Sequence, residues 1–244
     1  MAEKSIILYT CNFGNYDTFK EPIFSSGIVS YIMFTDIPQL SKVWNVKKVD
    51  WSSITNDPQK AARYFKINSH LLLPPHKISI WIDSSFGVNI KDFNKFIETH
   101  LGQADLGCHK HGREGRFARG CLYEEAEVCR KARLDSATVI DAQIDRYRKE
   151  GFPEGYGLNS TGLLVRRNCL KTNQFNEIWW NEVRMGSKRD QLSQMYAIWK
   201  SGINTHVIES PSIYANPNFI KVSHNWKLRA RKLRKDNTKP IIRR

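Results

Sequence analysis

The stretch KISIWIDSSFG, from Lys77 to Gly87, joins an apolar run to an acidic residue and two serines. Apolar side chains at positions 78, 80, 81 and 82 would cover both faces of an extended strand, which is typical of a central strand in a parallel sheet. A carboxylate at the carboxyl end of such a strand lies on the crevice where open α/β sheets bind ligands. Asp83 is therefore a candidate metal or ribose ligand. The alternative is that it ends the strand and caps a turn with Ser84 and Ser85.

Strand-like and helix-like segments alternate on both sides of this stretch, which predicts an α/β fold with a mostly parallel central sheet flanked by helices. The expected strands are residues 5–9, 31–35, 44–49 at an edge, 78–82, 162–165 and 204–208. The expected helices lie in residues 57–73, 91–100, 121–150 and 173–200. We predict one domain over residues 1–226 and a basic C-terminal tail over residues 227–244.

The bulk composition is that of a globular protein. The chain has 244 residues, of which 41% are hydrophobic and 25% charged, and its five cysteines form no CxxC pair. Reduced thiols are therefore expected rather than a disulfide framework or a zinc knuckle. No apolar run reaches the roughly 18 to 20 residues needed to span a bilayer, and MAEKSIILYT lacks the layout of a signal peptide. We expect a cytoplasmic protein.

The formal charge of +14 is unevenly distributed. Residues 227–244 hold nine Lys or Arg residues against one acid, a net charge of +8. Such a segment can bind an anionic membrane surface, because each Lys or Arg near an anionic leaflet contributes about 1 kcal/mol. We predict peripheral attachment to the inner face of the cytoplasmic membrane. A disordered solubilising tail is the alternative, and nucleic-acid binding is not favoured because no nucleic-acid motif precedes the tail.

The polar segment TCNFGNYD, residues 10–17, leaves the carboxyl end of the first expected strand, where nucleotide-binding loops are found. It is not a P-loop, because GxxxxGK[ST] is absent. In the helix expected over residues 57–73, Asp57 is a good N-cap and Pro58 suits the first helical position. Arg63 and Lys66 of this helix could contact a diphosphate, or they could form a solvated basic face.

Cations gather in residues 104–119, ADLGCHKHGREGRFAR, which we interpret as one glycine-punctuated loop. His109 and His111 are weak evidence for zinc, since no third ligand is near them in sequence. Anion binding by the arginines, Arg116 and Arg119 among them, is favoured instead. The acidic pair Glu124 and Glu125 that follows is interpreted as solvated helix surface.

Several motifs in order resemble a known family. They are YTCNFGNYD, YIMFTD, ARYFK, ISIWIDSS, CLYEEA, GLNSTGLLVRRN and KRDQLSQMYAIW. Together they resemble the glycosyltransferase-like family formerly catalogued as domain of unknown function 616, which occurs in plant mucilage and pollen proteins and in bacterial polysaccharide gene clusters. The likeness extends over roughly residues 5 to 225, and its most specific parts are FGNYD, WID and RDQLS.

This resemblance implies a GT-A-like, Rossmann-like domain that binds a nucleotide-sugar donor such as a UDP- or GDP-sugar. The nucleotide-sugar would then be held by Thr10, Asn12, Gly14, Asp17, Asp36, Arg63, Lys66, Arg116 and Arg119. The Asp-x-Asp motif that holds a divalent metal in GT-A enzymes is replaced here by Asp83-Ser84-Ser85, so that Asp83, Ser85 and His224 are the expected ligands of Mn²⁺ or Mg²⁺. Metal-free transfer with basic residues is the alternative.

The resemblance also implies an acceptor that is a saccharide or a lipid-linked saccharide, in the synthesis of surface polysaccharide of the O-antigen or capsule type. Asp190 of RDQLS is the expected base or sugar-orienting carboxylate, and Glu154 is the second choice. Two other functions compete with this one. One is an amide or ester hydrolase of ceramidase type, and the other is a non-catalytic module that binds nucleic acid or glycan.

Overall fold

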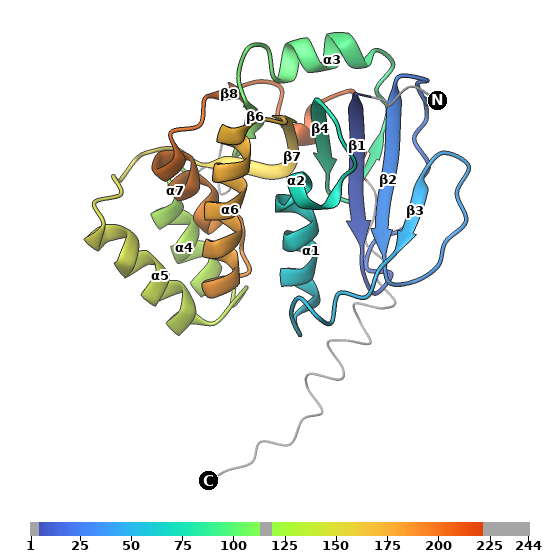
Figure 1. Ribbon diagram of the computed structural model, residues 1–244. Helices are drawn as coiled ribbons and strands as arrows, with labels where there is room; N and C mark the ends of the chain where they lie inside the picture. Colours follow the sequence, from blue (N-terminus) through green and yellow to red (C-terminus); the bar gives the residue numbers. More distant parts are fainter. Residues whose placement is uncertain (1–4, 113–118, 222–244) are drawn as a thin grey trace.

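The computed structural model describes residues 5–112 and 119–221. A sheet of seven strands runs through the molecule in the order β3-β2-β1-β4-β7-β6-β8 (Figure 1). Its strands are β1 (Ile6–Asn12), β2 (Val29–Thr35), β3 (Asn45–Lys48), β4 (Ile78–Ile82), β6 (Leu106–Lys110), β7 (Asn159–Arg167) and β8 (Thr205–Ile208). A second sheet pairs β5 (Phe86–Val88) with β9 (Phe219–Lys221).

Six strands of the large sheet run in one direction, and β7 runs against its neighbours β4 and β6. The predicted α/β fold with a mostly parallel central sheet is therefore confirmed. All seven residues of β1 and all five of β4 are buried, as expected for central strands covered on both faces. The edge strand β3 has three exposed residues of four.

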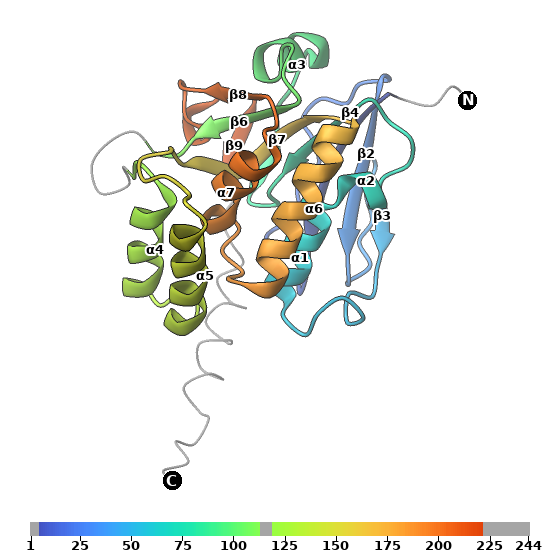
Figure 2. The same ribbon diagram turned by 60° about the vertical axis from the view of Figure 1, so that its left-hand side comes forward.

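The helices cover the sheet unequally. Helices α1 (Pro58–Ile67) and α6 (Leu170–Met185) lie side by side on one face, as both views show (Figures 1 and 2). The remaining helices are α2 (Ser69–Leu72), α3 (Phe93–His100), α4 (Leu122–Lys131), α5 (Ala137–Lys149), α7 (Gln191–Ser201) and the 3₁₀ helix η2 (Ile213–Ala215). The cap predicted for the first helix is confirmed, since the Asp57 side chain accepts from the Gln59 N–H at 2.7 Å. That helix ends at Ile67, six residues before the predicted end.

The buried guanidinium of Arg166 on β7 anchors the end of α1 to the sheet. It donates to the carbonyl oxygens of Ile67 at 3.0 Å and Lys66 at 2.8 Å, and to the Asn176 side chain on α6 at 2.9 Å. These bonds satisfy carbonyl groups that the end of a helix leaves without partners. As a result, the last turn of α1 is held beside the amino ends of β4 and β6, where Arg166 pairs with Ser79 and Leu106, and only the Lys66 side chain extends to Asp83.

The interpretation of residues 104–119 as one loop is wrong for its first half. Residues 106–110 form β6, and His109 has no exposed surface. Gly107 allows this strand to pass α3, because a Cβ at that position would lie 1.8 Å from the His100 carbonyl oxygen. Glycine weakens a strand pattern in the sequence, yet here it marks a close approach of two backbones.

Candidate functional site

Asp83 follows the last residue of β4 at the carboxyl end of the parallel strands. Its Oδ1 atom accepts from Trp81 Nε1 at 2.8 Å and from Lys66 Nζ at 3.4 Å. Its backbone N–H donates to the Gly162 carbonyl oxygen on β7 at 2.9 Å. Among the described residues Oδ2 has no hydrogen-bond partner, and the side chain is 32% exposed. The carboxylate is therefore held through Oδ1, and Oδ2 is left available for a ligand.

Asp190 is joined to Asp83 by a buried lysine. Lys66 Nζ lies 2.7 Å from Asp190 Oδ2, and Arg63 Nε lies 3.1 Å from Asp190 Oδ1. The Lys66 side chain is fully buried, and that of Asp190 is 3% exposed. We call Asp83, Asp190, Arg63 and Lys66 the Asp83 centre. The structure thus brings together four side chains that the sequence predicted separately, from α1, the end of β4 and the start of α7.

The surroundings of Asp190 favour an orienting role over that of a base. Burial alone would raise the pKa of this carboxyl, but the charges of Arg63 and Lys66 outweigh burial and hold the pKa below its ordinary value. A carboxylate with a lowered pKa is a weak proton acceptor at neutral pH. Its two salt bridges instead fix the direction of Arg63 and Lys66.

The loop after β1 is tied to the same end of the sheet. The Asn12 side chain donates to the Asp17 carbonyl oxygen at 2.8 Å, and Ser84 Oγ donates to the Asp17 carboxylate. At the far side of the loop, Gly14 has a positive φ of 63° and its N–H donates to Asp36 at 2.9 Å. Each of these predicted donor-site residues therefore contributes to the shape of the loop.

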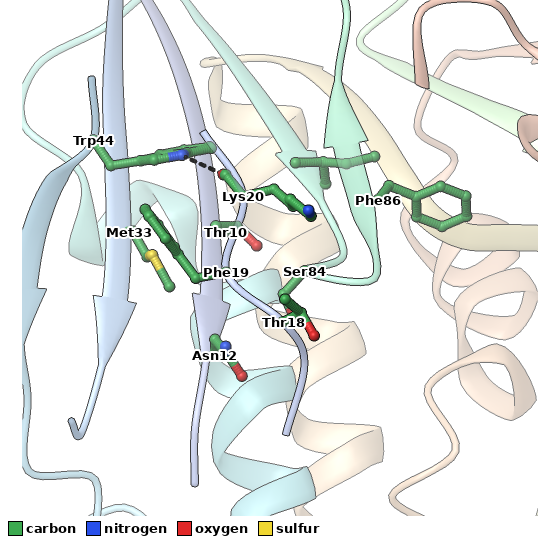
Figure 3. Close-up of a pocket in the computed structure, with 10 residues that line it drawn as sticks. Thr10, Asn12, Thr18, Phe19, Lys20, Met33, Trp44, Ser84 and Phe86 are labelled. Carbon is green, nitrogen blue, oxygen red and sulfur yellow. Dashed lines mark hydrogen bonds between the residues drawn. The ribbon is translucent and has the colours of Figure 1, made fainter. Parts of the chain in front are cut away.

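A pocket opens beside the carboxyl ends of β1 and β4 (Figure 3). The residues that line it are Thr10, Asn12, Thr18, Phe19, Lys20, Met33, Trp44, Ile82, Ser84 and Phe86. Trp44 Nε1 donates to the Lys20 carbonyl oxygen at 3.1 Å, which holds the indole at one wall. The hydroxyl of Thr10 is buried and has no hydrogen-bond partner among the described residues. A buried hydroxyl without a partner is unusual and suits a ligand contact.

The other predicted site residues lie apart or outside the described residues. Ser85 is partly buried in the turn after Asp83. Glu154 is exposed in the turn between α5 and β7, within electrostatic range of Tyr123, and no contact between described residues links it to Asp83 or Asp190. Arg116 and His224 lie outside the described residues. The tail, residues 227–244, and the boundary proposed at residue 226 lie there too.

Arg119 takes part in a second cluster that sequence reasoning missed. Its guanidinium forms an ion pair with Glu125 on α4 and lies 3.3 Å from His111 Nε2. Arg189, next to Asp190 in sequence, lies 3.9 Å from the other oxygen of Glu125. Glu125 is 1% exposed, so its interpretation as solvated surface is wrong. We call Glu125, Arg119, Arg189 and His111 the Glu125 centre.

The described residues fit a divalent cation in one way only. No group of three or more His, Cys, Asp or Glu side chains is placed to hold a metal in residues 5–112 and 119–221. Mg²⁺ and related ions, however, are often held by one or two carboxylates together with substrate phosphates and water. Asp83 Oδ2 suits that mode of binding, whereas a site built from protein ligands alone has no support in this part of the chain.

Comparison with known proteins shows the family of this chain. Residues 1–221 match the model of the TOD1/MUCI70 glycosyltransferase-like domain. The chain belongs to this family. The family resemblance predicted from the motifs is confirmed, and the α/β domain described above is the glycosyltransferase-like domain of a TOD1/MUCI70 member.

Two curated relatives in this family come from Arabidopsis thaliana. The probable hexosyltransferase MUCI70 is 22% identical over 223 residues, which cover 78% of this chain and 36% of that protein. The alkaline ceramidase TOD1 is 22% identical over 241 residues, which cover 85% of this chain and 50% of that protein. The chain thus spans about a third to a half of the length of the curated relatives it matches.

A crystal structure of S. aureus TarS, residues 1–349, is similar with a TM-score of 0.44 and 15% sequence identity over 85% of this chain and 59% of that one. Within the described part of this TOD1/MUCI70 member, no helix is both long enough and apolar enough to cross a membrane.

Proposed function

We propose that this protein transfers a sugar from a nucleotide-sugar donor, such as a UDP- or GDP-sugar, to a saccharide or lipid-linked saccharide acceptor. Membership of the glycosyltransferase-like family supports the reaction class. The observation that carries the proposal is Asp83, held by Trp81 and Lys66 at the carboxyl end of β4 with Oδ2 directed away from both partners. Ligands of open α/β sheets bind in the crevice outside the carboxyl ends of the strands, which is where Asp83 lies.

The donor nucleotide would lie against the loop after β1 and the pocket beside it. The Thr10 hydroxyl, the Asn12 amide and the Lys20 side chain supply polar groups there, while Phe19 and Trp44 supply aromatic ones (Figure 3). Ligand sites commonly combine apolar walls with a few polar groups that fix orientation. Asp36 and Gly14 would help to hold this loop in place rather than contact the base.

The diphosphate would lie beside Asp83. A departing nucleoside diphosphate carries negative charge that has to be neutralised as the glycosidic bond breaks. Asp83 Oδ2, with Ser85 and His224 as further candidate ligands, would hold Mn²⁺ or Mg²⁺, which when bound would supply the positive charge that neutralises the diphosphate. Arg63 and Lys66 would add positive charge behind Asp83, and Asp190 would keep both side chains aimed at it.

The acceptor hydroxyl needs a proton acceptor if the reaction inverts the sugar. Glu154 is the exposed carboxylate available for this role, and it would have to approach the site with its turn. Asp190 is the less suitable base because its two salt bridges lower its pKa. The broader setting we propose is surface polysaccharide synthesis of the O-antigen or capsule type.

Nucleotide binding is the direct test of this function. We expect the melting temperature of the full chain to rise with UDP, GDP or CDP in the presence of Mn²⁺, because ligands that bind the folded state stabilise it. Asp83→Asn should lose that rise while its unliganded stability changes little, since an amide oxygen can still accept from Trp81. Asp145→Asn, an exposed carboxylate on α5 with an i,i+3 arginine partner, is the matched control.

No stabilisation by any of the three nucleotides would argue strongly against a transferase. An unaltered response in Asp83→Asn would remove Asp83 from the donor site. A screen of nucleotide-sugar hydrolysis beside ceramide hydrolysis separates the transferase from the ceramidase-type alternative, because the wild-type chain should cleave the first class of substrate and leave the second unchanged.

We also propose that the basic tail, residues 227–244, attaches the protein to an anionic membrane surface at the inner face of the cytoplasmic membrane. Its net charge of +8 supports this. Cosedimentation with vesicles that contain anionic lipid should be strong for the full chain and should fall when residues 227–244 are removed. Equal binding of both forms would refute the attachment.

A further inference from the structure

The Glu125 centre has more positive than negative charge. Glu125 supplies one carboxylate, whereas Arg119 and Arg189 supply two guanidinium groups that always carry charge. The side chains of these arginines are 12% and 30% exposed, so neither is sealed from solvent. The Asp83 centre, in contrast, pairs two carboxylates with two cations. Arg189 also acts on Asp190, but across both centres four cations face three carboxylates among the described residues, so an added anion finds one excess positive charge.

Two buried nitrogen atoms of the Glu125 centre have neither a hydrogen-bond partner nor an ion-pair partner among the described residues. These atoms are Arg189 Nε and His111 Nδ1. The guanidinium of Arg119 can only donate, so His111 Nε2, 3.3 Å away, accepts. Burial and the charge of Arg119 lower the pKa of His111, which keeps the ring neutral and leaves the proton on Nδ1. Both nitrogen atoms are thus N–H donors in need of an acceptor.

The Glu125 centre lies, like Asp83, at the carboxyl end of the parallel strands. The contacts that each centre makes with β7 indicate how far apart the two centres are. Asp83 pairs with Gly162 of β7, while Gln191, at the start of α7, donates to the Asn159 carbonyl oxygen at 3.4 Å. Three residues along a strand correspond to about 10 Å. The Arg189 side chain also reaches the Gln191 side chain at 3.4 Å, which places it near the Asn159 end of that interval.

Tyr214 lies within electrostatic range of both centres. Partial desolvation and the Asp83 carboxylate raise the pKa of its hydroxyl, while Arg189 lowers it. The Tyr214 side chain is 68% exposed and its ring lies 5.5 Å from that of Phe86, which lines the pocket beside Asp83. An exposed aromatic ring beside the pocket can pack against a sugar ring.

We infer that the Glu125 centre binds an acidic group of the acceptor, a phosphate or a carboxylate, with Arg119, Arg189 and His111 as its donors. The inference rests on the proposed function, which puts the donor diphosphate at Asp83. An interval of about 10 Å along β7 would leave room for the transferred sugar between the two sites, so an anion at the Glu125 centre would belong to the acceptor. Arginine favours phosphate and carboxylate because its planar fork matches two oxygen atoms at once.

Binding of small acidic probes tests this assignment. Methyl phosphate and glucuronate should each stabilise the full chain at low ionic strength, and glucose, which has no charge, should not. Arg189→Gln should weaken binding of the preferred probe about tenfold or more, the loss expected for a hydrogen bond to a charged group. The matched control is Arg148→Gln, which replaces an α5 arginine whose side chain is 53% exposed and should leave the affinity unchanged. Because the tail also attracts anions, the readout is the difference between variants.

Glu125→Gln gives a result of opposite sign. Removing the carboxylate that competes for both arginines should tighten probe binding, provided that the variant folds. This arm also answers the question if Arg189→Gln fails to fold. Preference for methyl phosphate or for glucuronate would each support the inference and would identify the acceptor as phosphorylated or uronic.

Three outcomes would overturn the assignment. They are equal affinity in wild type and Arg189→Gln, weaker binding in Glu125→Gln, and loss of nucleoside diphosphate binding together with probe binding in Arg189→Gln. The last would assign these arginines to the donor and would leave the proposed transferase intact. Failure of every nucleoside diphosphate to bind, with normal probe binding, would instead sink the proposed function and with it the role of this centre in acceptor binding.

Discussion

The Asp83 centre and the Glu125 centre are built from the same kinds of side chain, yet they differ in charge balance and in access to solvent. In the Asp83 centre, Lys66 is fully buried and every carboxylate has a cation beside it. In the Glu125 centre, one buried carboxylate serves two partly exposed arginines. Balanced, buried charges hold a geometry, whereas an excess of partly exposed charge can bind a ligand. The balanced charges of the Asp83 centre hold Asp83 in position for the donor that we propose, whereas the Glu125 centre keeps the excess positive charge on which the inferred anion recognition rests.

The largest effect should come from Asp190→Asn. This change leaves Lys66 without its nearest carboxylate in a buried position, and breaking a buried ion pair by removing one partner costs about 3–5 kcal/mol. Urea unfolding at pH 7 measures the loss. Asp141→Asn, whose carboxylate on α5 is 52% exposed and pairs with Arg130, should lose less than about 1 kcal/mol. Equal losses in the two variants would show that the Asp83 centre is not the stabilising one.

A pH series separates the Asp83 centre from a buried histidine that lies outside both centres. Burial and the neighbouring His100 lower the pKa of His109 from 6.5 to about 4, so that the folded state binds its proton less readily than the unfolded state. Stability is therefore complete above pH 6.5 and falls as the pH drops toward 4. The loss between pH 7 and pH 5 should be about 2 kcal/mol from this residue.

His109→Asn tests that assignment, because the asparagine amide can keep the hydrogen bond that His109 Nδ1 makes with the Pro211 carbonyl oxygen at 3.0 Å. Urea unfolding of this variant should show a pH 7 to pH 5 change about 2 kcal/mol smaller than in wild type. Asp190→Asn should keep the wild-type change in that window, since the Asp190 carboxyl titrates below its ordinary pKa. A flattened profile in Asp190→Asn would transfer the pH dependence to the Asp83 centre.

Glu125→Gln should destabilise the protein by about 1–2 kcal/mol, less than Asp190→Asn, because both arginines that lose their partner can turn toward water. Guanidinium chloride would screen the charges under study, so urea is the denaturant for this comparison. A loss as large as that of Asp190→Asn would mean that the arginines of the Glu125 centre are as confined as Lys66, and the contrast between the centres would fail.

The smallest effect on stability should come from Tyr214→Ala. The side chain is 68% exposed, and surface substitutions of this kind change stability by about 0.5 kcal/mol or less. If the ring packs on a sugar between the two centres, kcat/KM for nucleotide-sugar hydrolysis should fall about threefold to tenfold. Tyr214→Phe keeps the ring and should retain most of the rate. Equal rates in wild type and Tyr214→Ala would leave Tyr214 without a role in binding.

Much of the sheet could be predicted from local pattern. The strand ending at Asp83 and the helix capped by Asp57 have signals contained in a few neighbouring residues, namely an apolar run and a cap followed by proline. Strand β6 could not be predicted in this way, because Gly107 and His109 weaken the pattern. Gly107 is required because the strand passes close to the His100 carbonyl oxygen at the end of α3, and His109 bonds to the Pro211 carbonyl oxygen, 102 residues away; neither contact can be seen in a local pattern.

The candidate site likewise has residues that a local pattern predicts and residues that only tertiary contacts reveal. Arg63 and Lys66 were placed on α1 and Asp190 at the start of α7 from sequence patterns, and the fold joins them through Asp190. Glu125 was missed because its neighbour Glu124 and the charged helix around it have the composition of a solvated surface. An i, i+4 pattern detects contacts within one helix, whereas the partners of Glu125, Arg119 and Arg189, lie outside its helix.

The sequence by itself determined the α/β class, the strand that ends at Asp83 and the family motifs, because apolar periodicity and caps act over a few residues. Only the tertiary structure decided that the ammonium of Lys66 lies between two carboxylates and that Glu125 is shared by two arginines. Charge balance depends on which distant side chains come within about 4 Å of one another, and that is set by the packing of α1, α4 and α7 around the end of the sheet.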